Sequence, residues 1–133
     1  MTRAALVLAL AILALGGLLL VRGVGHRSAV DKAIGALDDT WRFSTSARAA
    51  QTVADISTQL RFAGAACTPK QAPRCTALLQ AAAYSAVTAY TLADCTSPGV
   101  YDGHKAMLDY LRTVQRFLRH GGARPTVPKV ISC

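Results

Sequence analysis

The chain has 133 residues, a formal net charge of +8, and no Glu or Asn. This length can bury one hydrophobic core, which excludes a multidomain protein. The positive charge implies acidic partner surfaces or anionic lipid headgroups as neighbours. An apolar N-terminal segment and the lack of any recognition motif argue against nucleic acid as a partner.

An unbroken apolar run from Ala4 to Val21, flanked by Arg3 and Arg22, is the first predicted element. Its 18 uncharged residues reach the lower limit for a helix that crosses a hydrocarbon core of about 30 Å. A cleaved signal peptide is the alternative, because a short positive region precedes the run and small residues offer cleavage positions. The run is longer than a typical signal-peptide core, so we expect an uncleaved signal anchor over residues 1–27.

Two opposing features bear on the side of the membrane where the rest of the chain lies. Basic residues after the run slightly favour a cytoplasmic C-terminal domain. However, all four cysteines follow the run, and an even count beyond an export-like segment suggests two disulfides in an oxidising compartment. Because the charge difference is a single residue, we expect a single-pass plasma-membrane protein with an extracytoplasmic domain, or a secreted protein if the segment is cleaved.

Helix-forming residues predominate after the run, and stretches of β-branched residues are missing, which predicts an all-α domain. We therefore expect one N-terminal transmembrane helix followed by a small three- or four-helix bundle over residues 28–122. Ser28 can cap the first helix of this bundle. Apolar side chains then recur every three or four residues, which is typical of one helix face: Val30, Ile34, Leu37 and Trp41.

The apolar spacing slips through residues 43–46 and resumes at Val53, Ile56 and Leu60. A bend or short break near the slip is one interpretation, and a single long helix with a drifting face is the other. Gly64 and two following X-Pro pairs should end this segment, because proline lacks a backbone donor and restricts the residue before it. We expect a loop over residues 64–74.

The stretch from Cys75 to Ala93 carries no charged side chain. It is long enough for a second transmembrane helix, but Gln80 and several hydroxyl groups dilute it, and Tyr84 and Tyr90 lie inside it rather than at its ends. We expect instead a central helix that is buried on most of its circumference, with alanines allowing its neighbours to approach closely.

A helix over residues 98–120 has the clearest boundaries. Ser97 and Pro98 predict its start, and Gly121 and Gly122 predict its end. The pattern is strongly amphipathic. Its apolar face contains Met107, Leu111, Val114 and Leu118, and its basic face contains Lys105, Arg112, Arg116 and Arg119.

A proline-containing tail over residues 123–133 has no helical period, so some anchor must hold it. Four cysteines allow three pairings, and spacing alone does not choose among them. Geometry favours Cys67 with Cys75, which flank the turn between two antiparallel helices. Cys95 is then left to pair with Cys133. The extended tail is long enough to bring Cys133 back along the bundle to Cys95. A free Cys133 that links two chains is the alternative.

No constellation of catalytic residues is recognisable. There is no C-x-x-C motif, and the histidines lack the spacing of Cys/His metal ligands. Asp102 and His104 are the only acid and histidine close together, and an Asp in the first turn of a helix is explained by the helix dipole. We predict that the chain is not an enzyme and binds no cofactor, metal or small-molecule substrate.

The basic face, together with Arg124 beyond it, is the best candidate for a binding surface. The simpler explanation is the solvated side of any surface helix. The functional interpretation is docking on an acidic partner subunit, anionic lipid or an acidic envelope polymer. We expect a non-enzymatic accessory or scaffold subunit of a membrane or envelope complex. Binding of membrane lipid or envelope polymer through the basic face is the alternative.

Overall fold

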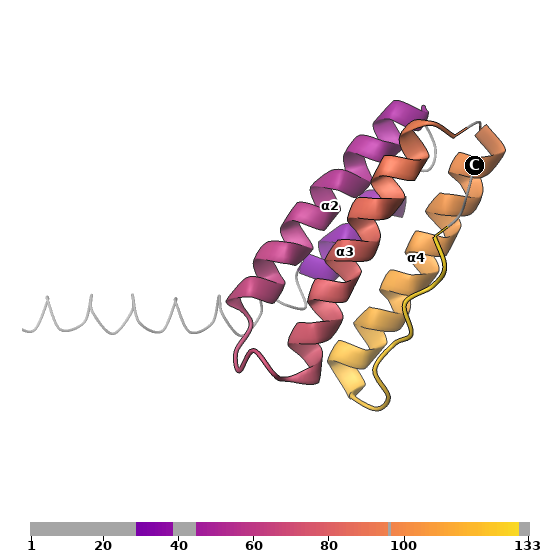
Figure 1. Cartoon of the computed structure of the whole chain (residues 1–133). Helices are drawn as coiled ribbons and strands as arrows, with labels where there is room; N and C mark the ends of the chain where they lie inside the picture. The colour runs from indigo at the N-terminus through magenta and orange to yellow at the C-terminus, as the bar shows by residue number, and fades with distance from the viewer. Residues whose placement is uncertain (1–28, 39–44, 96, 131–133) are drawn as a thin grey trace, which may run out of the picture.

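Figure 1 shows the computed structural model, which describes residues 29–38, 45–95 and 97–130. A helix occupies residues 29–38, and three longer helices follow: α2 (Ser46–Ala66), α3 (Pro73–Ala93) and α4 (Ser97–His120). The described ranges contain no strand, so the predicted all-α bundle is confirmed. Helices α2, α3 and α4 run alternately up and down, and the 29–38 helix lies behind α2 and α3 in this view.

The predicted membrane anchor over residues 1–27 lies outside the described residues, as does Trp41. In the part of the chain that is described, no helix has both the length and the apolar character that a membrane span needs.

The slip in the apolar pattern coincides with the start of a new helix. Thr45 caps α2, and its hydroxyl accepts a hydrogen bond of 3.2 Å from the backbone N–H of Arg48. Capping by a threonine side chain satisfies one of the N–H groups that a helix start leaves unpaired. The slip therefore separates α2 from the 29–38 helix, although residues 39–44 themselves are not described.

The expectation that Gly64 ends this helix is wrong. α2 continues to Ala66, and Gly64 is buried in it. A Cβ added at Gly64 would lie 2.7 Å from Cδ2 of Leu79 and 3.3 Å from the backbone nitrogen of Leu79. The glycine therefore serves the close approach of α2 to α3, and the loop between them spans only residues 67–72.

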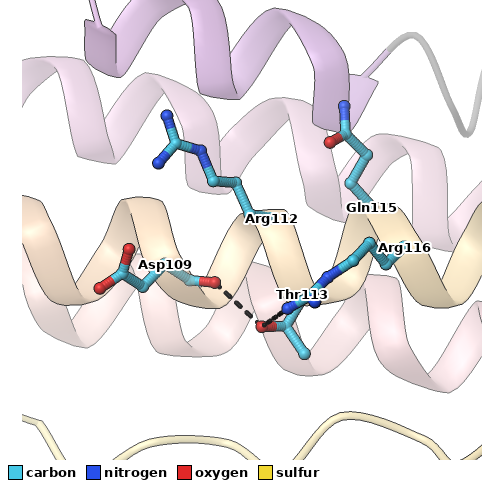
Figure 2. A pocket seen from close by; sticks show the side chains of 5 residues that line it. All are labelled: Asp109, Arg112, Thr113, Gln115 and Arg116. Carbon is cyan, nitrogen blue, oxygen red and sulfur yellow. Dashed lines mark hydrogen bonds between the residues drawn. The ribbon is translucent and has the colours of Figure 1, made fainter.

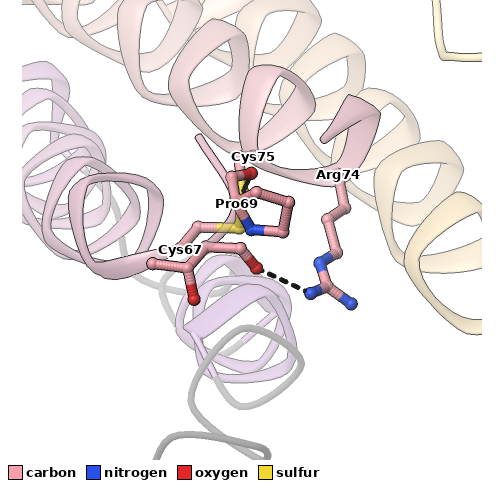
Figure 3. Close-up of a disulfide and its surroundings, with 5 residues drawn as sticks. Cys67, Pro69, Arg74 and Cys75 are labelled. Carbon is pink, nitrogen blue, oxygen red and sulfur yellow. Dashed lines mark hydrogen bonds between the residues drawn. A yellow bond between two sulfur atoms is a disulfide. The ribbon is translucent and has the colours of Figure 1, made fainter. Parts of the chain in front are cut away.

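A disulfide between Cys67 and Cys75 closes the turn between α2 and α3, as predicted (Figure 3). Their Cα atoms are 5.4 Å apart, and both residues are buried. The Arg74 guanidinium donates a 2.8 Å hydrogen bond to the Thr68 carbonyl across the same loop. On the chain-entropy model, closing so short a loop stabilises the fold by about 2.5 kcal/mol.

The predicted apolar faces form one core between the helices. Each helix contributes side chains that are almost completely buried, among them Val30, Leu37, Val53, Leu60, Leu78, Met107, Leu111 and Val114. Full burial of one such side chain stabilises the fold by about 1.5 to 3 kcal/mol. The helical period of the apolar residues therefore identified the faces that pack together.

Helix α3 is less enclosed than its sequence predicts. It packs mainly on α2 and less extensively on α4, while one side stays in solvent. Leu79 is 44% exposed, Val87 is 50% exposed and Tyr90 is 81% exposed. Beyond Arg74 in its first turn, α3 therefore carries no charged residue on its exposed side or on its buried side.

The tail runs back along α4 as far as residue 130, toward the end of α3 (Figure 1). Gly121 and Gly122 make the reversal with φ angles of 72° and 94°, which favour glycine. Pro125 is buried, and Val130 packs against the core. Cys95, just beyond α3, holds no free thiol. Its predicted partner Cys133 lies outside the described residues, so that pairing stays a prediction.

Gly64 in α2 and Gly35 in the 29–38 helix give a matched test of the α2–α3 contact. Gly35 is exposed, and a Cβ there would meet nothing within 4 Å. Gly35→Ala should raise the free energy of unfolding by about 1 kcal/mol through helix propensity. Gly64→Ala should leave the protein about 2 kcal/mol less stable than Gly35→Ala, because the new methyl group collides with Leu79. Thermal unfolding of the full chain in mild detergent, followed by circular dichroism, measures both, and equal stability would contradict the close contact.

Candidate functional site

Helix α4 presents the basic face as a row of side chains along its outer surface. Lys105, Arg112, Arg116 and Arg119 are spaced by three, four or seven residues, and Asp109 lies within the row. An open depression of about 440 Å³ lies in this row, lined by Asp109, Arg112, Thr113, Gln115 and Arg116 (Figure 2). Arg112 and Gln115 extend toward the 29–38 helix, whereas Arg116 lies back over Thr113.

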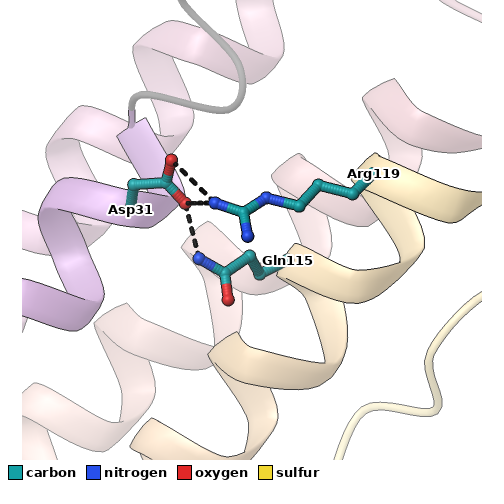
Figure 4. Close-up of polar contacts among 3 residues, drawn as sticks. All are labelled: Asp31, Gln115 and Arg119. Carbon is teal, nitrogen blue, oxygen red and sulfur yellow. Dashed lines mark hydrogen bonds and ion pairs between the residues drawn. The ribbon is translucent and has the colours of Figure 1, made fainter.

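Two of these arginines contact acids of the 29–38 helix. Asp31 accepts hydrogen bonds from Arg119, at 3.2 and 3.3 Å, and from the Gln115 amide at 2.6 Å (Figure 4). Arg112 lies 3.8 Å from the Asp38 carboxylate. Each such exposed pair stabilises the fold by up to about 1 kcal/mol. The contacts tie α4 to the first described helix.

The basic face therefore has a mixed rather than a uniformly positive charge. Lys105 also pairs with an acid, Asp109, at 2.9 Å one turn along the helix. Four basic residues and the three aspartates that contact them (Asp31, Asp38 and Asp109) leave a net charge of +1, from four minus three. The field above α4 is consequently weaker than the row of basic residues predicts.

Arg116 and Arg124 differ from the other members. Arg116 donates a 3.4 Å hydrogen bond to the Thr113 hydroxyl, which itself donates to the Asp109 carbonyl at 3.0 Å. Within the described part of the chain, neither Arg116 nor Arg124 has an ion pair. Arg124 is exposed in the tail beyond the glycine turn. These two guanidinium groups are the positive charges at the site that remain available for an external acid.

The contacts between the aspartates of the 29–38 helix and the arginines of α4 could have been predicted from residue spacing. Asp31 and Asp38 are seven residues apart, and so are Arg112 and Arg119. Seven residues are close to two helical turns, so each pair lies on one side of its helix. Antiparallel packing of the two helices brings Asp38 to Arg112 and Asp31 to Arg119, as observed.

His104 is a structural contact between helices. Its ring is buried, and its Nε2 atom is hydrogen-bonded to the Leu37 carbonyl of the 29–38 helix. Because α4 begins at Ser97, Asp102 is not in the first turn, and the dipole explanation for this residue is wrong. Asp102 is exposed whereas His104 points into the bundle. Asp102 and His104 therefore do not form an acid–base pair, although they are close in sequence.

A second group of polar side chains lies in the core between α3 and α4. The rings of Tyr84 and Tyr110 are 5.0 Å apart in an edge-to-face arrangement, and the buried Ser85 hydroxyl donates to the Ala81 carbonyl at 2.6 Å. Burial raises the pKa of both tyrosines above the usual 10.0. Because the folded state favours the neutral phenols, their contribution to stability is complete below about pH 10 and is lost as the pH rises through the raised pKa values.

The remaining predicted site residues are the cysteines, of which Cys67 and Cys75 are brought together and Cys133 is not described. Among the described residues, no group of three or more His, Cys and Asp side chains is arranged to hold a metal ion. Comparison with family models, curated proteins and solved structures finds no match to this chain. The basic face of α4 combines three ion pairs, the hydrogen bond from Gln115 to Asp31 and the open depression, and these contacts make it the candidate site in the described ranges.

Asp31 should matter more to stability than Asp109, although each contacts a basic residue of α4. Asp31→Ala removes the contacts of Arg119 and Gln115 to another helix and should lower the free energy of unfolding by about 1 kcal/mol. Asp109→Ala removes one contact within a single helix and should cost about 0.3 kcal/mol. Thermal unfolding at low and high salt measures both. Equal losses, or a loss for Asp31→Ala that does not shrink with salt, would refute the bridging role.

Proposed function

We propose that this chain is a membrane-tethered accessory protein without enzymatic activity. Its helical bundle stands outside the cytoplasm and docks through the basic face of α4 on a protein of the membrane or envelope. The apolar run from Ala4 to Val21 supports the tether, because its length suits a hydrocarbon core. The tether keeps the domain at the membrane surface, where it can bind a neighbouring membrane or envelope protein. The domain has no recognisable catalytic residues, so we infer a binding role.

The disulfide supports the extracytoplasmic placement. Cys67 and Cys75 are almost completely buried, so their bond is shielded from solution thiols and braces the fold rather than exchanging. None of the described cysteines is a free thiol. Stable disulfides of this kind are common outside the cytoplasm and rare within it.

The mixed charge of the basic face is the main reason to favour a protein partner over a lipid surface or an envelope polymer. A phosphate-rich lipid surface or polymer is attracted by the sum of positive charge, and here three aspartates reduce that sum to +1. A protein surface can match positive and negative groups individually, which gives specificity more than raw affinity. Arg116, flanked by Arg112 and Thr113 at the depression, offers a positive centre for an acidic residue of the partner.

The geometry at the depression is also partly fixed before any partner binds. Gln115 is held by Asp31, and Arg112 lies beside Asp38. Side chains that are already restrained lose less conformational entropy on binding. Such a surface suits a stable subunit contact.

Binding of anionic lipid or envelope polymer is the second candidate, favoured by Arg116 and Arg124. These two side chains have no ion pair among the described residues, and both are exposed. A pair of available guanidinium groups can bind phosphate or carboxylate oxygens. The two candidates differ in what lies next to Arg116 in the cell.

Photo-cross-linking from position 113, which lines the depression beside Arg116, separates the candidates. The full chain with Thr113→p-benzoylphenylalanine should form a discrete adduct with one other membrane or envelope protein when illuminated in its own membranes. Combining it with Arg116→Gln should reduce the yield, because the positive centre for the partner's acid is lost. The matched control places the same photoreactive residue at Gln59, which is exposed on α2, and should give no such adduct. Adducts with lipid or polymer alone would support the second candidate and contradict docking on a protein.

A further inference from the structure

The outer side of α3 carries an uncharged apolar stripe that the described part of the chain leaves largely open to solvent. It consists of Leu79, Ala83, Val87 and Tyr90, which are all exposed and recur at spacings of four, four and three. Residues with this spacing share one face of a helix. A row of exposed apolar side chains along one helix is a common mark of a protein–protein contact.

The position of Leu79 in this stripe is set by packing. Its side chain lies over Gly64 of α2, where there is no Cβ to push it outward. The backbone beneath the stripe is held by the disulfide-closed contact of α2 with α3. The stripe is therefore a fixed surface rather than a loose segment.

The charge of the chain bears on what occupies this stripe. The whole chain carries +8, yet residues Cys75 to Ala93 contain no charged side chain. Two copies that approach through surfaces rich in Lys and Arg bring like charges together. Along the stripe they do not, and the stripe itself offers an acidic partner no basic group. The stripe thus suits a second copy better than it suits a charged partner.

The spacing of the stripe is also self-complementary. Leu79 and Val87 lie four residues before and four residues after Ala83. If two α3 helices pack antiparallel about a two-fold axis at Ala83, Leu79 of each copy meets Val87 of the other. The small Ala83 side chain lets the two helices approach at the axis. The same register sets Asp94 of one copy opposite Ala72 of the other, which avoids contact between like charges.

We propose that the uncharged stripe of α3 binds a second copy of this chain, with the two α3 helices antiparallel and centred on Ala83. The contact is separate from the basic face of α4, which stays open in the dimer. A helix pair of this length makes a small interface, of the class that is weak in dilute solution. The dimer should therefore depend on protein concentration.

Cysteine cross-linking tests both the partner and the register. The experiment uses three single variants of the full chain: Leu79→Cys, Ala83→Cys and Val87→Cys. Each is oxidised in membranes, and disulfide-linked dimers are separated from monomers by gel electrophoresis without a reductant. Ala83→Cys should form a dimer by itself. Leu79→Cys and Val87→Cys should each stay largely monomeric but cross-link with each other when co-expressed, because identical residues are about 12 Å apart along the helix axis in this register.

Matched controls exclude collision in the membrane and misfolding. Gln59→Cys, exposed on α2, should give no dimer. In the Ala83→Cys background, Val87→Arg should abolish the cross-link by setting a charge against an apolar side chain, whereas Gln59→Arg should leave it unchanged. Both arginine variants should keep the helical circular dichroism of the parent.

Three results would overturn the proposal. Equal self-cross-linking at positions 79, 83 and 87 would indicate parallel packing. An Ala83→Cys chain that stays monomeric would show that no second copy binds there. Cross-links from Ala83→Cys only to a different protein would assign the stripe to another occupant.

Discussion

Helices α2 and α3 form a closely packed hairpin with a covalent link at its turn, and α4 packs against this hairpin. Gly64 removes the side chain that would separate the two helices, and the buried disulfide between Cys67 and Cys75 closes the turn that joins them. A domain of this size buries a modest core, so a covalent link at one end of the main helix pair matters. The hairpin then offers one side to α4 and the 29–38 helix and leaves the uncharged stripe of α3 in solvent.

The other two described helices are joined by polar contacts as well as by the core. Asp31 and Asp38 meet Arg119 and Arg112, and His104 reaches the Leu37 carbonyl. The basic residues of α4 thus serve the fold first. What remains for partners is a mixed-charge surface with Arg116 at its centre, and this is why we favour docking on a protein over attraction to a lipid surface.

Much of the fold could be predicted from the sequence, because helix periodicity and turn residues are local signals. The apolar face of α4 and its glycine end follow from residue spacing, and the Cys67–Cys75 pair follows from the antiparallel turn expected between the two helices that these cysteines flank. The role of Gly64 could not be predicted from the sequence. A glycine that ends a helix and a glycine that lets a neighbouring helix approach look alike without tertiary structure. The exposed side of α3 and the neutralisation of the basic face were missed for the same reason: both depend on which helix lies alongside. For the acids, the shared seven-residue spacing was a usable signal.

We propose that this disulfide-braced bundle stands in an oxidising compartment. The most direct test is to block free thiols as the cells are broken, isolate the full chain from its own membranes, and map its disulfides by mass spectrometry without reduction. A bundle in an oxidising compartment should show no blocked cysteine, one bond between Cys67 and Cys75, and one between Cys95 and Cys133. Four blocked thiols, or a bond from Cys67 to Cys95 or Cys133, would contradict it.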